Sequence, residues 1–450
     1  MPPLRPADIL PRHQQVAMPS QPAASKALLT IGVTAIASDG VASPQDVRGL
    51  RKAFVIAQML ARIAWLAFRT SRSPLRTVIA LRRLLAALQT EQWATPTHRR
   101  ARLWTSQKFV FSSGRYFWDF YAPGWPSVAF DRCIERELVR VDPLGRPPGL
   151  NTIFIAITRR CALKCEHCFE WDVLNRPESL SATELQEIMR RVQSCGTAQI
   201  VFSGGEPLQR FADLLTLAAS ASTESDVWVQ TSGLGLSAEK ARRLREAGVT
   251  GISLSLDHWD AEGHDRFRGL PGTFKSVKRA ARHARDAGLL VALSLCPTRS
   301  FVTAENLQHY AETARSLGAS FIQMLEPKAI GHYAGQDVAL APAQQRVLEE
   351  FCERLNTDPA ARDLPTVEYM DWSARELGCC GAGDRYAYID TDGGLHACPF
   401  CRTPGLRVLD QDINAALSTL QANGCPAAGA YTREASVITT VESPLLRMSP

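Results

Sequence analysis

Three closely spaced cysteines follow an apolar segment in the first half of the chain. They stand in the order Cys161-Ala-Leu-Lys-Cys165-Glu-His-Cys168. Such a loop can wrap one face of an iron–sulfur cube, because cysteine thiolates are the usual protein ligands of these clusters. Three thiolates serve three irons of a cube, so one iron is left open to an outside ligand. The alternative chemistry is a zinc site completed by a distant ligand or by His167.

A second motif ends the next apolar segment. It reads Phe202-Ser-Gly-Gly-Glu-Pro207, so that two glycines precede Glu206. Glycine permits close approach of the backbone, and a carboxylate at this place can receive an ammonium group. Taken alone, Gly-Gly-Glu-Pro is an ordinary turn. At the end of the strand that follows a CxxxCxxC loop, it resembles the radical S-adenosylmethionine (SAM) superfamily over about residues 150–330.

The resemblance implies that SAM is cleaved reductively at a [4Fe-4S] cluster on Cys161, Cys165 and Cys168. It implies a 5′-deoxyadenosyl radical that abstracts hydrogen from a C–H bond, and an external one-electron donor such as flavodoxin or ferredoxin. Beyond the cluster itself, no catalytic residue is assigned. Arg266 competes with Arg268 for the basic position of the family. By resemblance, SAM contacts are expected at His167, Gly204, Gly205, Glu206, Pro207, Thr231, Ser255, Asp257 and Arg268.

A second group of cysteines lies near the carboxyl end of the sequence. Cys380 and Cys398 flank a predicted hairpin that turns at Asp392-Gly393, which suits the meeting of two thiols. The pattern resembles the truncated auxiliary-cluster (SPASM/twitch) domain of many radical SAM enzymes. The resemblance implies a second [4Fe-4S] cluster with sulfurs roughly 6–7 Å apart, on Cys380, Cys398, Cys401 and Cys425.

Three alternatives stay open at this second group. Cys379 can replace Cys380 as a ligand, the four thiols can form a structural zinc ribbon, or they can be unligated. Four further cysteines are scattered along the chain and are expected to be small buried residues, namely Cys133, Cys195, Cys296 and Cys352.

Alternating apolar strands and amphipathic helices begin near residue 153. Short connections between them imply a parallel sheet wound right-handedly. Six such units predict an α/β fold, a partial (β/α)6 radical SAM barrel, with the motifs beyond the carboxyl ends of its strands. The strands are expected at 153–158, 199–203, 227–231, 251–256, 289–295 and 320–325, and the clearest helices at 182–195, 209–221, 238–246, 274–286 and 304–316.

The amino-terminal part is basic. Residues 1–150 hold 21 Lys and Arg against 9 Asp and Glu, a net charge of +12 within a chain of +6. Two helices are predicted within 48–102, where twelve basic residues face one acid, Glu91, and a hairpin is predicted over 108–120. The two helices suit a helical cap on the barrel or a peripheral contact with an anionic membrane surface.

The predicted domain organisation has six parts. They are a disordered leader (1–25), a basic helical and hairpin extension (26–150), the barrel (151–330), a helical connector (331–378), an auxiliary-cluster domain (379–426) and a tail (427–450). Clustered thiols in a chain of 450 residues argue against a secreted disulfide scaffold. No uninterrupted apolar run reaches the ~18–20 residues of a membrane span, so a cytoplasmic enzyme is expected.

The substrate class is not fixed by these motifs. Peptide or small-molecule modification is the first interpretation, because enzymes with SPASM-type domains are most often of that kind. Radical modification of a membrane lipid or isoprenoid is the alternative. A zinc-containing nucleic-acid-binding protein is the non-enzyme alternative, and the Gly-Gly-Glu-Pro motif argues against it, so no nucleic acid partner is expected.

Overall fold

The computed structural model describes residues 44–90, 108–141, 149–377, 379, 382–402 and 405–425. All of these residues belong to one compact unit that spans Val41–Pro450. The predicted leader and tail lie outside the described residues, and so does Cys380.

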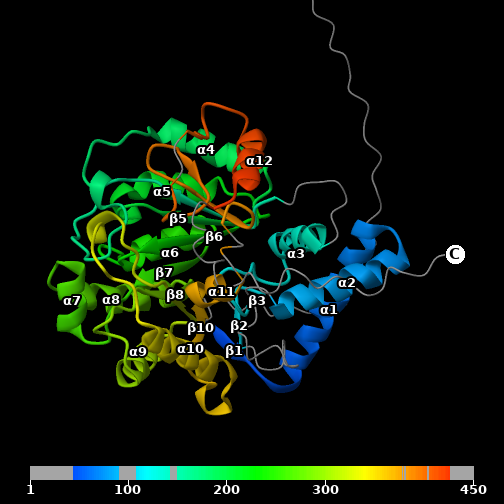
Figure 1. Cartoon of the computed structure of the whole chain (residues 1–450), viewed down its shortest axis with the longest axis horizontal. Helices are drawn as coiled ribbons and strands as arrows, with labels where there is room; N and C mark the ends of the chain where they lie inside the picture. The colour runs from blue at the N-terminus through cyan, green and yellow to red at the C-terminus, as the bar shows by residue number, and fades with distance from the viewer. Residues whose placement is uncertain are drawn as a thin grey trace, which may run out of the picture. The chain divides into compact units, whose positions relative to one another are not determined.

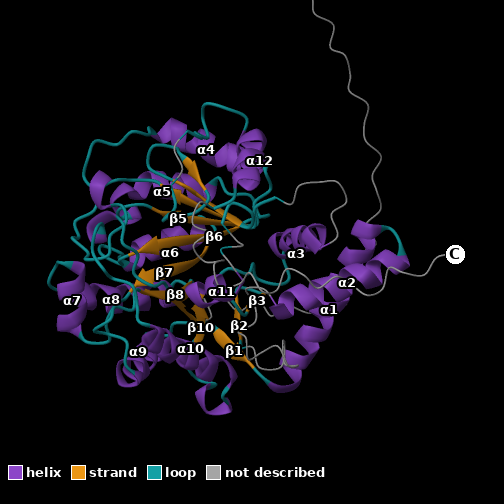
Figure 2. Ribbon diagram, in the orientation of Figure 1, coloured by secondary structure: helices purple, strands orange, loops and turns teal. Residues whose placement is uncertain are grey.

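A nine-stranded sheet forms the centre of this unit, with the strand order β10-β9-β8-β7-β6-β5-β4-β11-β12 (Figure 2). The strands from β4 to β9 run parallel to their neighbours, as the predicted partial barrel requires. Their side chains are buried on both faces, which explains their nearly continuous apolar sequences. These strands are β4 (Thr152–Ala156), β5 (Gln199–Ser203), β6 (Asp226–Thr231), β7 (Val249–Ser255), β8 (Leu290–Leu295) and β9 (Phe321–Met324).

Helices connect the parallel strands (Figure 1). The capping box at Ser181 is confirmed, because its hydroxyl accepts from the Glu184 amide while the Glu184 carboxylate accepts from the Ser181 amide. One helix that was not predicted from the sequence, α7, has eight residues and leads from β7 to α8. The helices are α4 (Ala182–Ser194), α5 (Phe211–Ala219), α6 (Ala238–Glu246), α7 (Ala261–Arg268), α8 (Thr273–Asp286) and α9 (Ala304–Ser316).

Two further strands extend the parallel barrel sheet on either side. Strand β10 (Thr366–Tyr369) pairs in parallel with β9, so the predicted helical connector also contributes a strand. The strand contains the ionisable Glu368, and its four residues are too few to show a periodic pattern. On the other side, β11 (Tyr386–Ile389) pairs in parallel with β4 and in antiparallel with β12 (Leu395–His396). The remaining elements of this half are η2 (Trp171–Val173), η3 (Pro207–Arg210), η4 (Gly331–Tyr333), α10 (Pro342–Thr357), η5 (Pro359–Ala361), α11 (Met370–Leu377) and α12 (Ile413–Asn423).

The amino-terminal extension is a small α/β layer with its own core. The predicted hairpin forms, and it turns at Ser113 and Gly114, which have φ angles of 53° and 79°. Its three strands pair in the order β1-β2-β3 and pack against the three helices of the extension. The elements are β1 (Gln45–Val47), α1 (Gly49–Ser71), α2 (Pro74–Thr90), β2 (Phe109–Ser112), β3 (Arg115–Phe117) and α3 (Val128–Val141).

Helix α1 is the one helix of the described chain that is long and apolar enough to cross a membrane, with a mean hydropathy of 1.3 in its most apolar window. One side of it is nevertheless a core face, because Val55, Met59, Ile63 and Leu66 are buried against the rest of the extension. Only 28% of that window is buried, so the opposite side of the helix faces outward.

The extension closes the amino-terminal end of the barrel interior. Phe117 and Phe120 pack among barrel side chains near the start of β6, β8 and β9, including Trp228, Leu290 and Phe321. The ring centroids of Phe120 and Trp228 lie 4.8 Å apart in an edge-on arrangement. The extension therefore plugs the end of the barrel opposite the predicted motifs, which gives a place to the cap that the sequence predicted without one.

A buried pair of carboxyl groups, Asp119 and Glu368, joins the extension to β10. Burial raises the pKa of Glu368 well above 4.5, and the charge of Asp119 raises it further. A carboxyl group whose pKa is raised in the folded protein contributes stability when the pH is below its pKa in the unfolded chain. This contribution is lost as the pH rises through its pKa in the folded protein.

We therefore predict that the melting temperature of the wild type falls by about 2 °C or more as the pH is raised from about 4.5, the ordinary pKa of a glutamate, towards the raised pKa of Glu368. Glu368→Gln, which cannot ionise, should flatten this part of the profile, as measured by circular dichroism. Glu350→Gln, an exposed position on α10, serves as the control and should keep the wild-type slope. Identical slopes in the wild type and Glu368→Gln would contradict the assignment.

Candidate active site

A cavity of about 170 Å³ opens at the carboxyl ends of the parallel strands. This is the end where parallel α/β barrels place their chemistry. The cavity is lined by the first cysteine group, by the Gly-Gly-Glu loop, by the last residues of β6, β7 and β8, by the segment that follows β9 and by Phe400 of the second cysteine group. Both predicted cysteine groups therefore border one space.

The first cysteine loop is held in its middle and at its end by backbone hydrogen bonds. The Lys164 and Glu166 amides donate to the carbonyl oxygens of Arg268 and Phe267, at 3.1 and 3.0 Å, where α7 ends. On the other side, the His332 amide of η4 donates to the Cys168 carbonyl oxygen at 3.0 Å. Two segments distant in sequence thus fix a loop that has no regular structure of its own.

Asn175 clamps the start of the cysteine loop. Its amide oxygen accepts from the Cys161 amide at 3.0 Å, and its amide nitrogen donates to the Cys161 carbonyl oxygen at 2.9 Å. The residue adopts a left-handed conformation, with a φ of 58°, which asparagine tolerates better than most residues. The sequence analysis missed this residue, although an asparagine shortly after a metal-binding loop is the available signal.

Segment η4 lies tightly against the third cysteine. The ring of His332 stacks on Trp171 with centroids 3.8 Å apart, and its Nδ1 lies 2.9 Å from the Cys165 carbonyl oxygen. A Cβ atom on Gly331 would lie 2.2 Å from the Cys168 carbonyl oxygen, so only glycine fits there. The start of the predicted connector is therefore part of the site.

The two glycines of the Gly-Gly-Glu-Pro motif pack against the backbone that leads into the cysteine loop. A Cβ atom would lie 2.6 Å from the Thr158 carbonyl oxygen at Gly204 and 2.5 Å from that of Arg160 at Gly205. The amides of Gly205 and Glu206 donate to these same two oxygens, at 2.8 and 2.7 Å. The close backbone approach that the glycines predict is therefore a contact between two parts of the protein, namely the Gly-Gly-Glu loop and the segment that leads into the cysteine loop.

Glu206 is buried and is held by the end of β6. One carboxylate oxygen accepts from the Thr231 hydroxyl at 2.6 Å and from the Leu208 amide at 3.0 Å. The other accepts from the Ser232 amide at 2.9 Å and from the Ser232 hydroxyl. The carboxylate is thereby fixed on the cavity wall, and Ser232 joins Thr231 as a contact that the sequence analysis did not single out.

Arg268 and Arg266 occupy different environments. Arg268 is buried and lines the cavity, where one of its nitrogens lies 3.5 Å from Cys165 Sγ. It forms an ion pair of 2.5 Å with Asp257, which is buried behind it and whose other oxygen accepts from the Cys296 amide. Arg266 is exposed and pairs with Glu262 at 3.3 Å. Asp257 is therefore placed to orient Arg268.

His167 lies on the cavity wall, stacked on Phe267 with centroids 4.9 Å apart. Burial lowers the pKa of His167 to about 4. Its Nδ1 atom is buried and has no hydrogen-bond partner among the described residues. A flat neutral ring with an unused polar atom in the wall suits a heterocyclic ligand.

Most of the predicted SAM contacts line this cavity, but two do not. Pro207 starts η3 beneath the loop, and Asp257 lies behind Arg268. Three cavity residues that the sequence analysis did not assign are Cys296, Glu326 and Lys328. Cys296 is buried, as expected for a scattered cysteine, yet it stands where β8 meets the cavity. The predicted contacts that do line the cavity are His167, Gly204, Gly205, Glu206, Thr231, Ser255 and Arg268.

The second cysteine group converges as well. The sulfurs of Cys398, Cys401 and Cys425 lie within 4.8 Å of one another. Hydrogen bonding to the Cys425 thiol raises the pKa of Cys379, and burial adds to the shift. The sulfurs are closer than the roughly 6–7 Å expected across a cube, because hydrogen-bonded thiols approach each other directly. Within the described chain, Cys161, Cys165 and Cys168 form no group as tight as this.

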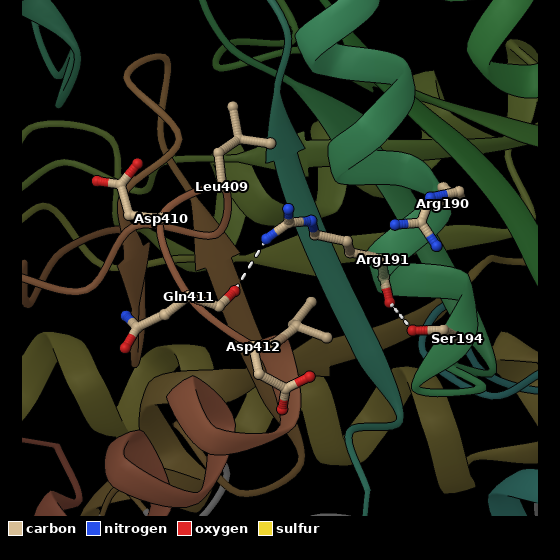
Figure 3. A pocket seen from close by; sticks show the side chains of 8 residues that line it. Arg190, Arg191, Ser194, Leu409, Asp410, Gln411 and Asp412 are labelled. Carbon is tan, nitrogen blue, oxygen red and sulfur yellow. Dashed lines mark hydrogen bonds between the residues drawn. The ribbon is translucent and has the colours of Figure 1, made fainter.

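Helix α12, which ends just before Cys425, lies beside α4 (Figure 1). The guanidinium of Arg191 on α4 donates to the carbonyl oxygens of Val408 and Gln411, at 2.6 and 2.9 Å. Figure 3 shows this side chain reaching from α4 to the segment that leads into α12. The barrel therefore helps to set the position of the most distant cysteine of the group.

Aromatic side chains connect the two cysteine groups. Phe169, next to Cys168, packs edge-on against Phe400, which lies between Cys398 and Cys401, with ring centroids 5.6 Å apart. Arg402 pairs with the buried Glu170 at 2.5 Å. The two loops are thus packed against each other directly, and Phe400 reaches the cavity between them.

Comparison with known proteins agrees with this arrangement. The sequence model of the Radical SAM superfamily matches residues 155–317. The AdoMet-dependent heme synthase of Oleidesulfovibrio alaskensis is 31% identical over 280 residues, which cover 56% of this chain and 70% of that protein. The chain belongs to the radical SAM superfamily. Membership implies a [4Fe-4S] cluster and SAM, and the chain is therefore an enzyme.

One further relative and one solved structure are also similar to this chain. The PqqA peptide cyclase of Granulibacter bethesdensis is 30% identical over 254 residues, which cover 54% of this chain and 65% of the cyclase. Among solved structures, SuiB of Streptococcus suis bound to S-adenosylmethionine aligns with a TM-score of 0.51 at 14% identity, covering 67% of this chain and 72% of SuiB. The likeness to SuiB concerns the fold.

The contact between Gly331 and Cys168 generates a prediction. Gly331→Ala should displace the cysteine loop, lower the iron content after anaerobic reconstitution and slow SAM cleavage by about 100-fold, the order expected for a misplacement of about 1 Å. Gly335→Ala is the matched control, since Gly335 also has a positive φ, 75°, but nothing lies within 4 Å of a Cβ atom there. Equal iron contents in the two variants would contradict this role of Gly331.

Proposed function

We propose that the protein is a peptide-modifying radical SAM enzyme with an auxiliary [4Fe-4S] cluster. The observation that carries this proposal is the single cavity bordered by the first cysteine loop, the Gly-Gly-Glu loop and Phe400 of the second cysteine group. The name of the PqqA peptide cyclase supports a peptide substrate. Electrons would come from an external one-electron donor such as flavodoxin or ferredoxin.

The residues of the cavity fit a cluster with bound SAM. Cys161, Cys165 and Cys168 would hold the cluster, which together with SAM supplies reductive C–S cleavage and a 5′-deoxyadenosyl radical. Glu206, held by Thr231 and Ser232, would accept the methionyl ammonium group, and His167 would lie against the adenine. The positive charge of Arg268 lies beside Cys165, where it stabilises negative charge on the ligand set.

The far wall of the cavity is suited to orienting a polar substrate. Lys328 lies there, ion-paired with Asp371, whose other oxygen accepts from the Glu326 amide at 2.8 Å. Glu326 is in turn bonded to Tyr369 and Arg375. A network of this kind fixes the ammonium group of Lys328 where a substrate carbonyl or carboxylate would meet it.

For the auxiliary site, we propose Cys379, Cys398, Cys401 and Cys425 as the ligands. The contact between Cys379 and Cys425 supports Cys379, whereas the spacing to Gly393 in the sequence favours Cys380. Sulfurs within 4.8 Å of one another also suit a single tetrahedral zinc ion. Metal analysis separates these two kinds of site.

Anaerobic reconstitution should give about eight irons per chain from two cubane clusters. Changing Cys161, Cys165 and Cys168 together to Ala should leave about four, and Cys398→Ala should also leave about four while SAM cleavage persists. Cys379→Ser should destabilise the second cluster more than Cys380→Ser, as followed by iron content and absorption. Stoichiometric zinc in place of the second set of irons would refute the auxiliary cluster.

The two arginines of α7 provide a matched pair for the SAM site. Arg268→Gln should weaken SAM binding by about tenfold or more, since it removes a buried charge and leaves Asp257 unpaired. Arg266→Gln changes an exposed side chain and should bind SAM as the wild type does. Binding is measured by isothermal titration with the reconstituted proteins, and the reverse ranking would show that the register is misplaced.

A tetrapyrrole is the second candidate substrate, because the heme synthase relative is matched over 70% of its length. A synthetic peptide encoded beside the gene, incubated with enzyme, SAM and dithionite, should change in mass while 5′-deoxyadenosine accumulates. Under the tetrapyrrole alternative, the visible absorption of a porphyrin with carboxylate side chains would shift when it binds the protein. The porphyrin, and not the peptide, would then be converted. Conversion of the porphyrin and not of the peptide would contradict the proposal of a peptide substrate.

A further inference from the structure

Large apolar side chains are exposed mainly on one part of the molecule. Among the described residues, nine such side chains are exposed, and eight of them belong to α1 and α2. The outer face of the helix pair, as we name this set, consists of Leu50, Phe54, Leu60, Trp65, Phe68, Leu75, Val78 and Ile79, with exposures from 38% to 91%. Single exposed apolar residues are common on protein surfaces, whereas a contiguous group of this kind indicates an interaction surface.

The spacing on α1 places four of its five exposed apolar side chains on one side of the helix, whereas Leu60 lies about 80° outside their arc. At 100° per residue, Leu50, Phe54, Trp65 and Phe68 fall within an arc of roughly 60°. The buried side chains of α1 lie on the opposite side, where Met59 and Leu66 are fully buried in the core of the extension. The helix is therefore bound to the protein along one side and apolar along the other, and it does not span a bilayer.

The charge of the helix pair indicates the kind of partner. Residues 49–90 contain eight Lys and Arg and no Asp or Glu, and two of the eight, Arg62 and Arg69, are ion-paired with Asp131 and Glu135 of α3. Arg72, Arg76 and Arg82 are exposed beside Leu75, Val78 and Ile79. This composition repels a second copy of the same face and attracts an anionic surface.

Trp65 shows how the apolar and basic groups combine. The guanidinium groups of Arg62 and Arg69 lie 4.2 and 4.8 Å from the centre of its ring. Trp65 nevertheless keeps 45% of its surface exposed. Tryptophan and arginine together at an exposed apolar stripe are typical of helices that lie in the headgroup region of a bilayer.

We propose that the outer face of the helix pair seats the enzyme on an anionic lipid bilayer, with α1 and α2 lying in the interfacial plane. The face belongs to the extension that plugs the amino-terminal end of the barrel, so seating leaves the active-site cavity at the other end of the strands open. This inference does not depend on the substrate of the enzyme.

The test uses the full-length protein and sedimentation with sucrose-loaded vesicles. Vesicles of phosphatidylcholine with about 40% phosphatidylglycerol should carry the wild type down, pure phosphatidylcholine should bind it much less, and added salt should weaken the binding. Combining Phe54→Ser, Trp65→Ser and Phe68→Ser should weaken the partition by about tenfold or more. SAM cleavage should stay at the wild-type rate, which shows that the variant is folded.

Two matched charge variants complete the test. Arg72→Gln, Arg76→Gln and Arg82→Gln together should reduce binding to the anionic vesicles. The same number of changes on α8, at the exposed positions Lys275, Lys278 and Arg282, should leave it unchanged. Failure of the wild type to sediment with either vesicle overturns the proposal, and so does equal binding to both. A wild-type dimer that the α1 variant converts to a monomer, without lipid binding, would show a self-association surface instead.

Discussion

The close contact between the cysteine loop and its neighbours is the constraint on which the site depends. The loop between Cys161 and Cys168 has no regular structure, so its shape must come from backbone groups presented by other segments. The Gly204-Gly205 loop, the end of α7 and η4 each donate or accept such bonds. Glycine is required wherever these backbones approach most closely, since a Cβ atom would enter the space of a carbonyl oxygen.

This constraint also links the cavity to the rest of the barrel. Asp257, just after β7, holds Arg268 with one oxygen and the amide of Cys296, just after β8, with the other. Glu206 in the same way binds the end of β6 to the loop after β5. Buried carboxylates thus join neighbouring strand ends and keep the cavity wall in one arrangement. Buried charges are tolerated at these places because each has a charged or hydrogen-bonding partner.

The sequence predicted the parallel barrel and the motif residues of the cavity wall, because local signals specify both. Apolar strands, capping residues such as Ser181 and the motif around Glu206 are readable within a few residues. It missed β10, Asn175 and Lys328, whose roles depend on partners far along the chain. Asp257 was predicted as a SAM contact because it stands at a strand end, but a strand end can face the cavity or lie behind it, and spacing does not separate these cases.

The pairing of β11 with β4 has a consequence for how the chain reaches its fold. The first barrel strand spans residues 152–156, and the strand that covers its outer edge spans residues 386–389. During synthesis, the edge of β4 therefore stays open until more than two hundred further residues have been added. An uncovered edge is a template for wrong pairing with another chain. Completion of the sheet therefore depends on the segment that carries the second cysteine group. When β11 pairs with β4, it covers the open edge and also brings these cysteines to their place.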